Sequence, residues 1–387
     1  MASGFKKDDP TFGSIDLDDE YVTDAWLIDK YVGNALWSWG ENTSGGLGLL
    51  NIVHRSSPVQ VGSLTNWKQV KTAATASIAI KTDGSIWSWG MNNSGQLGLG
   101  NIVDRSSPVQ VGTLTNWKLV GCGTDHHAAI TTNGGLWSWG LNSSGQLGLL
   151  NVTNRSSPVQ VGTLTDWKSV STGGGYSTYA IKTGGTLWSW GLNTQGQLGL
   201  LNVTNRSSPV QVGTLTDWKV VASGFEHALA VKTDGTLWSW GTNSSGRLGL
   251  GNIVHRSSPV QVGSLTNWKS VSTNGYSSIA IKTDGSIWSW GQNNYGQLGL
   301  NDTVSRSSPV QVGTLTNWKL ISSGFYHTAA IKTDGTLWIW GANLNGRLGL
   351  GDLVNRSSPI QVGSLTNWKE VNAGGGQTIA IPFADIT

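Results

Sequence analysis

The chain repeats itself with a fixed period. The first tryptophan of a Trp-x-Trp-Gly motif recurs in steps of 50 or 51 residues, at Trp37, Trp87, Trp137, Trp188, Trp238, Trp288 and Trp338. Such a period is typical of solenoids and propellers, in which one supersecondary unit buries its apolar face only against the next. The repeat therefore predicts that residues 35–387 form one body, although a length of 387 residues alone would suggest two or three domains.

Residues 79–90 show the pattern of each unit. Ala-Ile-Lys-Thr-Asp-Gly-Ser-Ile-Trp-Ser-Trp-Gly reads as two short strands around a turn at Asp83 and Gly84. An Asp-Gly pair predicts a two-residue hairpin loop in which both residues have positive φ. Because side chains alternate along a strand, Trp87 and Trp89 are expected on one face of the second strand.

The rest of each unit predicts two more strands. Residues 92–99 form a glycine-containing loop, residues 105–112 an alternating Val-x-Val strand after a proline, and residues 114–120 a turn and another strand. Four strands in about 50 residues indicate a propeller blade. The 54 glycines and 22 tryptophans also suit an all-β chain.

Composition excludes several classes of site. The single cysteine, Cys122, excludes an internal disulfide framework and a cysteine-based zinc site. No apolar run reaches the roughly 18 residues that span a bilayer, so we expect no membrane insertion. Residues 35–387 carry 22 Lys and Arg against 14 Asp and Glu, a net +8 that the repeat spreads around the body. A nucleic-acid partner would need clustered basic residues, so none is expected.

Residues 1–34 lie outside the repeat and form a predicted acidic arm. They hold eight acids and three lysines, a net −5. Residues 18–32 have acids in the first turn and apolar residues at helical spacing, which predicts one helix. We expect Val22, Trp26 and Leu27 on this helix to anchor the chain to a larger assembly; the alternative is a helix packed on its own propeller.

The repeat resembles a known family. Each unit is similar to the regulator of chromosome condensation repeat, through the pattern A-I-K-T-D-G-x-x-W-x-W-G-x-N-x-x-G-Q-L-G followed by R-S-S-P. This version of the repeat sequence resembles that of phage and environmental bacterial members of the family. The resemblance covers residues 35–387 and implies an all-β, seven-bladed β-propeller; kelch and WD repeats fit less well. The last strand, residues 377–381, is expected to pair with residues 36–40 and close the ring, which removes the open sheet edge.

The units differ mainly in one loop, which precedes the Ala-Ile-Lys-Thr strand. By symmetry, these seven loops lie on one rim of the disc, and unlike aromatic and polar groups on a uniform scaffold are typical of a binding face. Drift in unconstrained loops is the alternative. The predicted partner-binding rim comprises Asp125, His126, Tyr176, Phe225, Glu226, His227, Tyr276, Phe325, Tyr326, His327 and Gln377.

We expect no catalytic residues, metal or cofactor. His126, His227 and His327 occupy equivalent positions in alternate units, which would hold them too far apart for one ion. The repeat forces together no Ser/His/Asp arrangement and no pair of carboxylates. The seven repeated arginines, one in each unit, are interpreted as structural hydrogen-bond donors.

These observations predict a non-enzymatic protein-binding scaffold. The resemblance implies three kinds of function: a nucleotide-exchange factor, an ultraviolet-B photoreceptor and a bacterial inhibitor of β-lactamase. The photoreceptor is rejected because the repeat tryptophans occupy scaffold positions, and the near-perfect repeats argue against exchange activity. The preferred prediction is a bacteriophage virion protein, a capsid or tail decoration that contacts virion components through the arm and a host surface molecule through the rim. The first alternative is an extracellular or cytoplasmic bacterial propeller of the inhibitor type, and a guanine-nucleotide exchange factor ranks below it.

Overall fold

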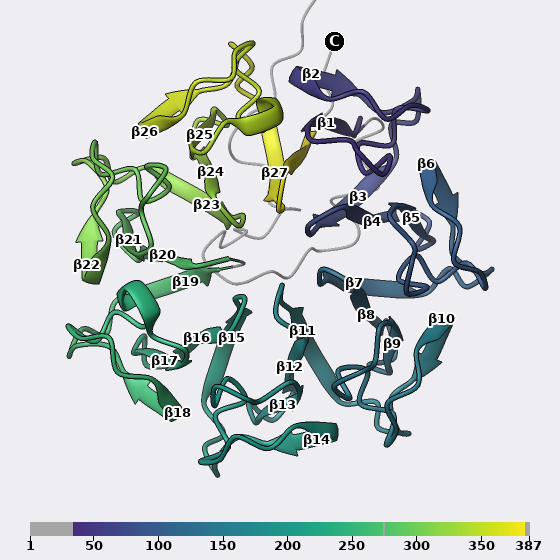
Figure 1. Cartoon of the computed structure of the whole chain (residues 1–387), viewed down its shortest axis with the longest axis vertical. Helices are drawn as coiled ribbons and strands as arrows, with labels where there is room; N and C mark the ends of the chain where they lie inside the picture. Colours follow the sequence, from purple (N-terminus) through teal and green to yellow (C-terminus); the bar gives the residue numbers. More distant parts are fainter. Residues whose placement is uncertain (1–33, 274, 384–387) are drawn as a thin grey trace, which may run out of the picture.

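Seven four-stranded antiparallel sheets are arranged around a central axis in the computed structural model, which describes residues 34–273 and 275–383 (Figure 1). The predicted all-β, seven-bladed propeller is therefore confirmed. In this part of the chain the only helices are two short 3-10 helices, η1 (Ser244–Gly246) and η2 (Leu344–Gly346). None is long and apolar enough to cross a membrane. The predicted arm, with Val22, Trp26 and Leu27, lies outside the described residues.

Six blades follow one another along the chain, each with four consecutive strands. They are β3 (Trp67–Thr72), β4 (Ala76–Lys81), β5 (Ile86–Gly90) and β6 (Arg105–Gln110); β7 (Trp117–Cys122), β8 (His126–Thr131), β9 (Leu136–Gly140) and β10 (Arg155–Gln160); β11 (Trp167–Thr172), β12 (Ser177–Lys182), β13 (Leu187–Gly191) and β14 (Arg206–Gln211); β15 (Trp218–Ser223), β16 (His227–Lys232), β17 (Leu237–Gly241) and β18 (Arg256–Gln261); β19 (Trp268–Ser272), β20 (Ser277–Lys282), β21 (Ile287–Gly291) and β22 (Arg306–Gln311); and β23 (Trp318–Ser323), β24 (His327–Lys332), β25 (Leu337–Gly341) and β26 (Arg356–Gln361).

The seventh sheet closes the ring with strands from both ends of the repeat. Its order is β2 (Arg55–Gln60), β1 (Trp37–Gly40), β28 (Gln377–Pro382) and β27 (Trp368–Ala373). β1 pairs with β28 from Trp37 opposite Ala380 to Gly40 opposite Gln377. The predicted closure is confirmed, and we call this sheet the closing blade.

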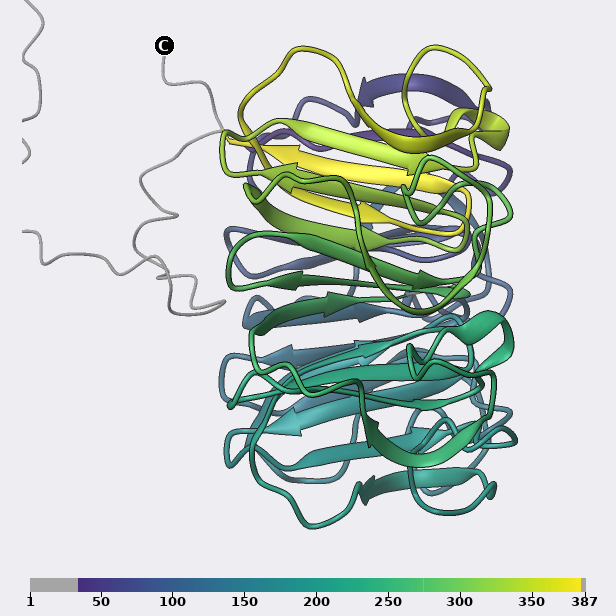
Figure 2. The same cartoon turned by 90° about the vertical axis from the view of Figure 1, so that its left-hand side faces the viewer.

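In every blade the first strand is innermost and the fourth is outermost, as β7 and β10 show in Figure 1. The strands run between the two faces of the disc, which is seen from its edge in Figure 2. The loop between the first and second strands of each blade therefore opens on one face, and the hairpin between the second and third strands opens on the other. The inner loops of all seven blades gather around the axis on the first of these faces.

The core lies between blades. Seven hydrophobic clusters each join the second and third strands of one blade to the next blade. In one of them, the Trp67 ring packs edge-on against Trp87 and Trp89, with centroids 6.2 and 6.1 Å away, beside Ile379 and Ile381 of the closing blade. Edge-to-face aromatic pairs add about 0.5–1.5 kcal/mol each beyond the area that they bury. These pairs lie within one blade, and Trp89 joins it to the closing blade by donating from Nε1 to the carbonyl of Gly46 (2.9 Å).

The hairpin turn differs from the predicted two-residue type. Gly84 donates to the carbonyl of Lys81 (3.0 Å) and has φ +79°, whereas Asp83 is not among the residues with positive φ. This arrangement is a type I turn followed by a left-handed glycine, which is the usual three-residue hairpin loop. Asp83 belongs here because its carboxylate accepts hydrogen bonds from Ser85 N and Oγ (2.8 and 2.6 Å).

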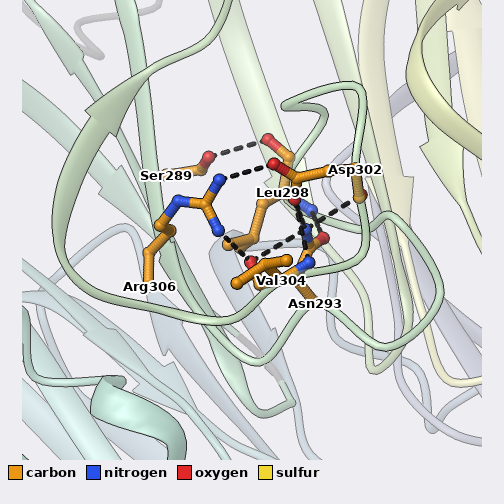
Figure 3. A network of polar contacts seen from close by, with 6 residues as sticks. All are labelled: Ser289, Asn293, Leu298, Asp302, Val304 and Arg306. Carbon is orange, nitrogen blue, oxygen red and sulfur yellow. Dashed lines mark hydrogen bonds and ion pairs between the residues drawn. The ribbon is translucent and has the colours of Figure 1, made fainter.

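An asparagine and an arginine hold the long loop before the outermost strand (Figure 3). Asn293 accepts from the backbone N–H of Leu298 (2.9 Å) and donates to Asp302 Oδ1 (3.0 Å) and the carbonyl of Val304 (3.1 Å). Arg306 donates to the same carbonyl (2.6 Å) and forms an ion pair with Asp302 (2.5 Å). The repeated arginine therefore has the structural role that was predicted for it, at least in this blade.

Candidate functional site

The loops between the first and second strands define what we call the variable face. These loops comprise residues 73–75, 123–125, 173–176, 224–226, 273 with 275–276, 324–326 and 374–376. Backbone hydrogen bonds join neighbouring loops: Phe225 N–H donates to the carbonyl of Gly275 (3.2 Å), and Phe325 N–H to that of Gly374 (3.0 Å). The loops therefore hold one another around the axis, and side chains from different blades can meet there.

Five aromatic side chains from three consecutive blades form one cluster on this face. Phe225 lies 5.3 Å from Tyr276 and 6.1 Å from Phe325, measured between ring centroids. Tyr326 contacts Tyr276 (6.0 Å), Phe325 (6.4 Å) and Tyr295 (5.5 Å). Tyr295 is 43% exposed, and the other four are half-buried. We call these five residues the aromatic cluster.

The two phenylalanines reach a loop of another blade. A Cβ atom on Gly174 would lie 2.9 Å from Cε1 of Phe325 and 3.1 Å from Cδ2 of Phe225. Gly174 lies in the loop after β11, whereas Phe325 lies in the loop after β23, three blades further along the chain. The absence of a side chain at Gly174 therefore lets both rings extend over the end of the central axis.

Two buried arginines lie beside the aromatic cluster. The guanidinium carbon of Arg247 is 5.0 Å from the centroid of the Tyr276 ring, and its Nε donates to the carbonyl of Ser244 (3.0 Å). Its Nη1 has no hydrogen-bond partner among the residues that the structure describes. Burial lowers the pKa of Arg247 from its usual value, and the nearby charge of Glu226 opposes this shift. The equivalent Arg347 donates from Nη1 to the carbonyl of Gly375 (2.8 Å).

Tyr176 and Asp125 form a separate pair on the same face. The Tyr176 hydroxyl and the Asp125 carboxylate share a hydrogen bond. Burial raises the pKa of both groups. The charge of the Asp125 carboxylate raises the pKa of Tyr176 further. Tyr176 has φ +58°, at the loop where the third unit carries its extra residue. The part of the predicted rim that reaches the surface therefore includes two groups, the aromatic cluster without Tyr295 and the pair of Tyr176 and Asp125.

Four residues of the predicted rim do not belong to it. His126, His227, His327 and Gln377 begin second strands and are at most 1% exposed, so they cannot contact a partner on the surface. Their side chains extend into the next blade: His126 Nε2 lies 2.9 Å from Thr178 Oγ1, for example. Burial lowers the pKa of His126 to about 3, so its imidazole is neutral. These three histidines are therefore structural residues that form hydrogen bonds between neighbouring blades.

Sequence reasoning also missed three residues of this site. Tyr295, Arg247 and Arg347 lie outside the loop that varies most, in the Asn-x-x-Gly-Gln-Leu segment. Each departs from the residue that most other units have there, serine or glutamine. Comparing every position of the units, and not only one loop, would have identified them.

Across residues 34–273 and 275–383, no three His, Cys, Asp or Glu side chains are grouped so that they could hold a metal ion. The arrangement on the variable face, half-buried rings beside buried guanidinium groups, is suited to binding.

Family comparisons match nearly all of the described chain. Residues 34–80, 83–130 and 133–180 match the model of the regulator of chromosome condensation (RCC1) repeat, and a second repeat model matches residues 117–146. Residues 178–383 match the model of the RCC1-like domain. A comparison with curated protein sequences finds no match.

Solved structures with the same fold are distant in sequence. Human WBSCR16 is 21% identical with a TM-score of 0.82, covering 91% of this chain and 100% of that one. Prp20p from Saccharomyces cerevisiae is 18% identical with a TM-score of 0.78, covering 92% and 94%. Yeast Prp20 in its complex with Kap60 is 19% identical with a TM-score of 0.81, covering 92% of each chain. At these identities the likeness shows the fold alone.

Proposed function

Because the chain belongs to the family of RCC1-repeat propellers, we propose that it is a protein-binding scaffold whose partner docks on the aromatic cluster of the variable face. One observation carries the proposal: five aromatic rings from three blades contact one another on a face where otherwise alike units differ. Aromatic residues and arginine are enriched among the residues that dominate binding energy in protein interfaces.

The buried arginine adds a polar requirement to this surface. Arg247 is 5% exposed, and its Nη1 has no acceptor in the described part of the chain. A buried donor without an acceptor costs about 1–3 kcal/mol, more when the group is charged. A partner that places a carbonyl or carboxylate oxygen beside Tyr276 would remove this cost. The proposed partner therefore offers an apolar side chain to the rings and an acceptor to Arg247.

Structural relatives support a protein as the ligand. Prp20p is described with its binding properties to Gsp1p and histones, and yeast Prp20 is seen bound to Kap60. Propellers of this fold thus bind other proteins. A role in a phage virion, with the arm as anchor and a host molecule on the rim, stays a prediction from the sequence, as does the alternative of an inhibitor-type bacterial propeller.

The test compares matched surface variants of the full chain. Tyr276→Ser with Tyr326→Ser removes two rings of the aromatic cluster, whereas Leu215→Ser with Leu265→Ser removes two exposed leucines (43% and 46%) from the opposite face. The partner is identified by cross-linking and co-purification from the native source, and binding is measured by calorimetry. At about 1 kcal/mol or more per ring, the tyrosine pair should weaken binding at least about thirtyfold.

Two results would contradict the proposal. One is a partner that binds the tyrosine variant as tightly as the wild-type chain, with circular dichroism showing both to be folded. The other is an equal loss of binding in the leucine variant, because the partner would then occupy the opposite face.

A further inference from the structure

The face opposite the variable face carries a ring of lysines. Each first strand begins with Trp-Lys, and these strands are innermost, so the repeat places one lysine per blade around the axis (Figure 1). The seven are Lys68, Lys118, Lys168, Lys219, Lys269, Lys319 and Lys369. Five of them are exposed, and Lys68 and Lys369 are half-buried. We call this surface the lysine face.

A groove lies on the lysine face between the β11–β14 and β15–β18 blades. Its volume is about 340 Å³, and its walls are mainly polar. It is lined by Lys168, Lys182, Thr183, Gly184, Gly185, Thr216, Trp218, Lys219 and Thr233. Three ammonium groups and three threonine hydroxyls line the same space, and no carboxylate does. A volume of this size lies at the lower end of small-molecule sites.

The hairpin turn of the β11–β14 blade explains why the groove lacks a carboxylate. Four other turns have aspartate at the second turn position, and the turn of the β7–β10 blade has asparagine there but threonine in place of the preceding lysine. Only the β12–β13 turn keeps the lysine, Lys182, and has glycine, Gly184, in place of the acid. The neighbouring groove, of about 350 Å³, includes Asp234 among its lining residues. Hydrogen bonds from Thr236 keep the pKa of Asp234 below its usual value, so that this carboxylate is charged at neutral pH.

One acidic residue lies at the edge of the groove. Asp166 forms an ion pair with Lys182 at 3.3 Å, and it draws the ammonium to 4.7 Å from the centroid of the Trp188 ring. The equivalent lysine Lys282, which has no such pair among the described residues, lies 3.5 Å from the Trp288 ring. Lys168 and Lys219 are the other two charged side chains that line the groove.

We propose that this groove binds the phosphate groups of a small polyphosphate anion. Lysine supplies charge to phosphate oxygens without a directional demand, and threonine hydroxyls donate hydrogen bonds to the same oxygens. Three ammonium groups that line one groove, with a single carboxylate at its edge, favour an anion with several charges over a single carboxylate. The site is independent of the proposed protein-binding surface, because it lies on the opposite face of the disc.

The experiment uses sodium tripolyphosphate as the probe and the full chain, by calorimetry at low ionic strength. Gly184→Asp gives this turn the aspartate that four other turns have, and so adds a carboxylate to the groove. Gly184 does not have positive φ, and a Cβ there meets nothing within 4 Å, so the fold tolerates the change. Gln160→Glu, at an exposed position on the outermost strand β10, makes the same change in net charge away from the groove. Saturable binding to the wild-type chain is expected, weakened at least tenfold in Gly184→Asp and less than twofold in Gln160→Glu.

Three results would overturn the proposal. The first is no saturable binding of tripolyphosphate by the wild-type chain at millimolar concentration. The second is unchanged affinity in Gly184→Asp, which would place any bound anion elsewhere on the lysine ring. The third is an equal loss in both variants, because the binding would then reflect the net charge of the molecule and not the groove. Thermal melting of each variant verifies that it is folded.

Discussion

Two tryptophans at equivalent positions differ in one hydrogen bond, and replacing each by phenylalanine should reveal its contribution. Trp290 Nε1 donates to the carbonyl of Arg247 at 2.9 Å. Trp39 occupies the same position in the closing blade, opposite Arg347, but its Nε1 has no partner in the described part of the chain. Both rings are fully buried, and each packs on a glycine of the preceding unit.

The expected difference follows from the cost of burying a polar group. Both substitutions remove the same volume, so the cavity contribution to the free energy of unfolding largely cancels. Trp290→Phe also loses a hydrogen bond with a net contribution of about 0.5–1.5 kcal/mol, whereas Trp39→Phe removes a buried donor that costs about 1–3 kcal/mol. Trp290→Phe should therefore be more destabilising than Trp39→Phe by about 1.5–4.5 kcal/mol.

Guanidinium denaturation followed by far-UV circular dichroism measures both variants. Trp139→Phe is the matched control, because its Nε1 donates to the carbonyl of Gln96 at 2.9 Å in another blade, and it should behave like Trp290→Phe. Equal m-values would show that the three variants expose the same surface on unfolding. If Trp39→Phe destabilises the chain as much as the other two, within about 0.5 kcal/mol, then the unpaired Nε1 of Trp39 does not carry the expected cost.

Three further predictions concern the ring as a whole. Deleting residues 377–387 removes β28 from the closing blade and should lower the melting temperature of the entire propeller, since each blade is stabilised by its neighbours; an unchanged melting temperature would show that the seam carries no stability. Gly98→Ala should destabilise the chain by at least about 2 kcal/mol, because the new Cβ would lie 2.8 Å from Trp139 Nε1 and the backbone has φ +72°. Gly112→Ala is the control: its φ is +61°, a Cβ there meets nothing within 4 Å, and only the left-handed strain of about 1–2 kcal/mol is expected. Chemical denaturation measures both. Burial lowers the pKa of His127 to about 4, below the value of about 6.5 in the unfolded chain. The contribution of His127 to stability is therefore complete above pH 6.5, and about 2 kcal/mol is lost by pH 5 because the unfolded chain takes up the proton first. His127→Gln should reduce the fall in melting temperature between pH 7 and pH 5.

The propeller could be predicted because the same pattern is written seven times. Trp87 and Trp89 in one unit have counterparts in every other unit, so a strand pair predicted correctly in one unit was predicted correctly in all of them. The strand missing from the first unit could be matched to residues 377–381. The turn at Asp83 was predicted wrongly because its type depends on how Lys81 pairs with Ser85 across the hairpin, and the dipeptide does not reveal this.

The site was harder to predict because it depends on contacts between blades. His227 was assigned to a surface loop, yet it is the first residue of β16, where the strand directs its side chain toward Ser278 of the next blade. The meeting of Phe225 with Phe325 depends on two loops 100 residues apart that converge at the axis. Nothing in the spacing of one unit reveals how far such rings reach.

The construction of the closing blade has a consequence for how the chain folds. Because the units are nearly alike, β1 could pair with the second strand of an earlier blade and give a smaller ring, or with that of another molecule and give a linked dimer. The closing blade differs from the others at positions that oppose this error. Gln377 Nε2 donates to Thr72 and to Ser77 Oγ (3.0 Å), and Asn372 accepts from the backbone of Thr72 (2.8 Å). These bonds to the blade that follows β1 and β2 in the chain identify the last unit as the correct neighbour, and so help to set the number of blades at seven.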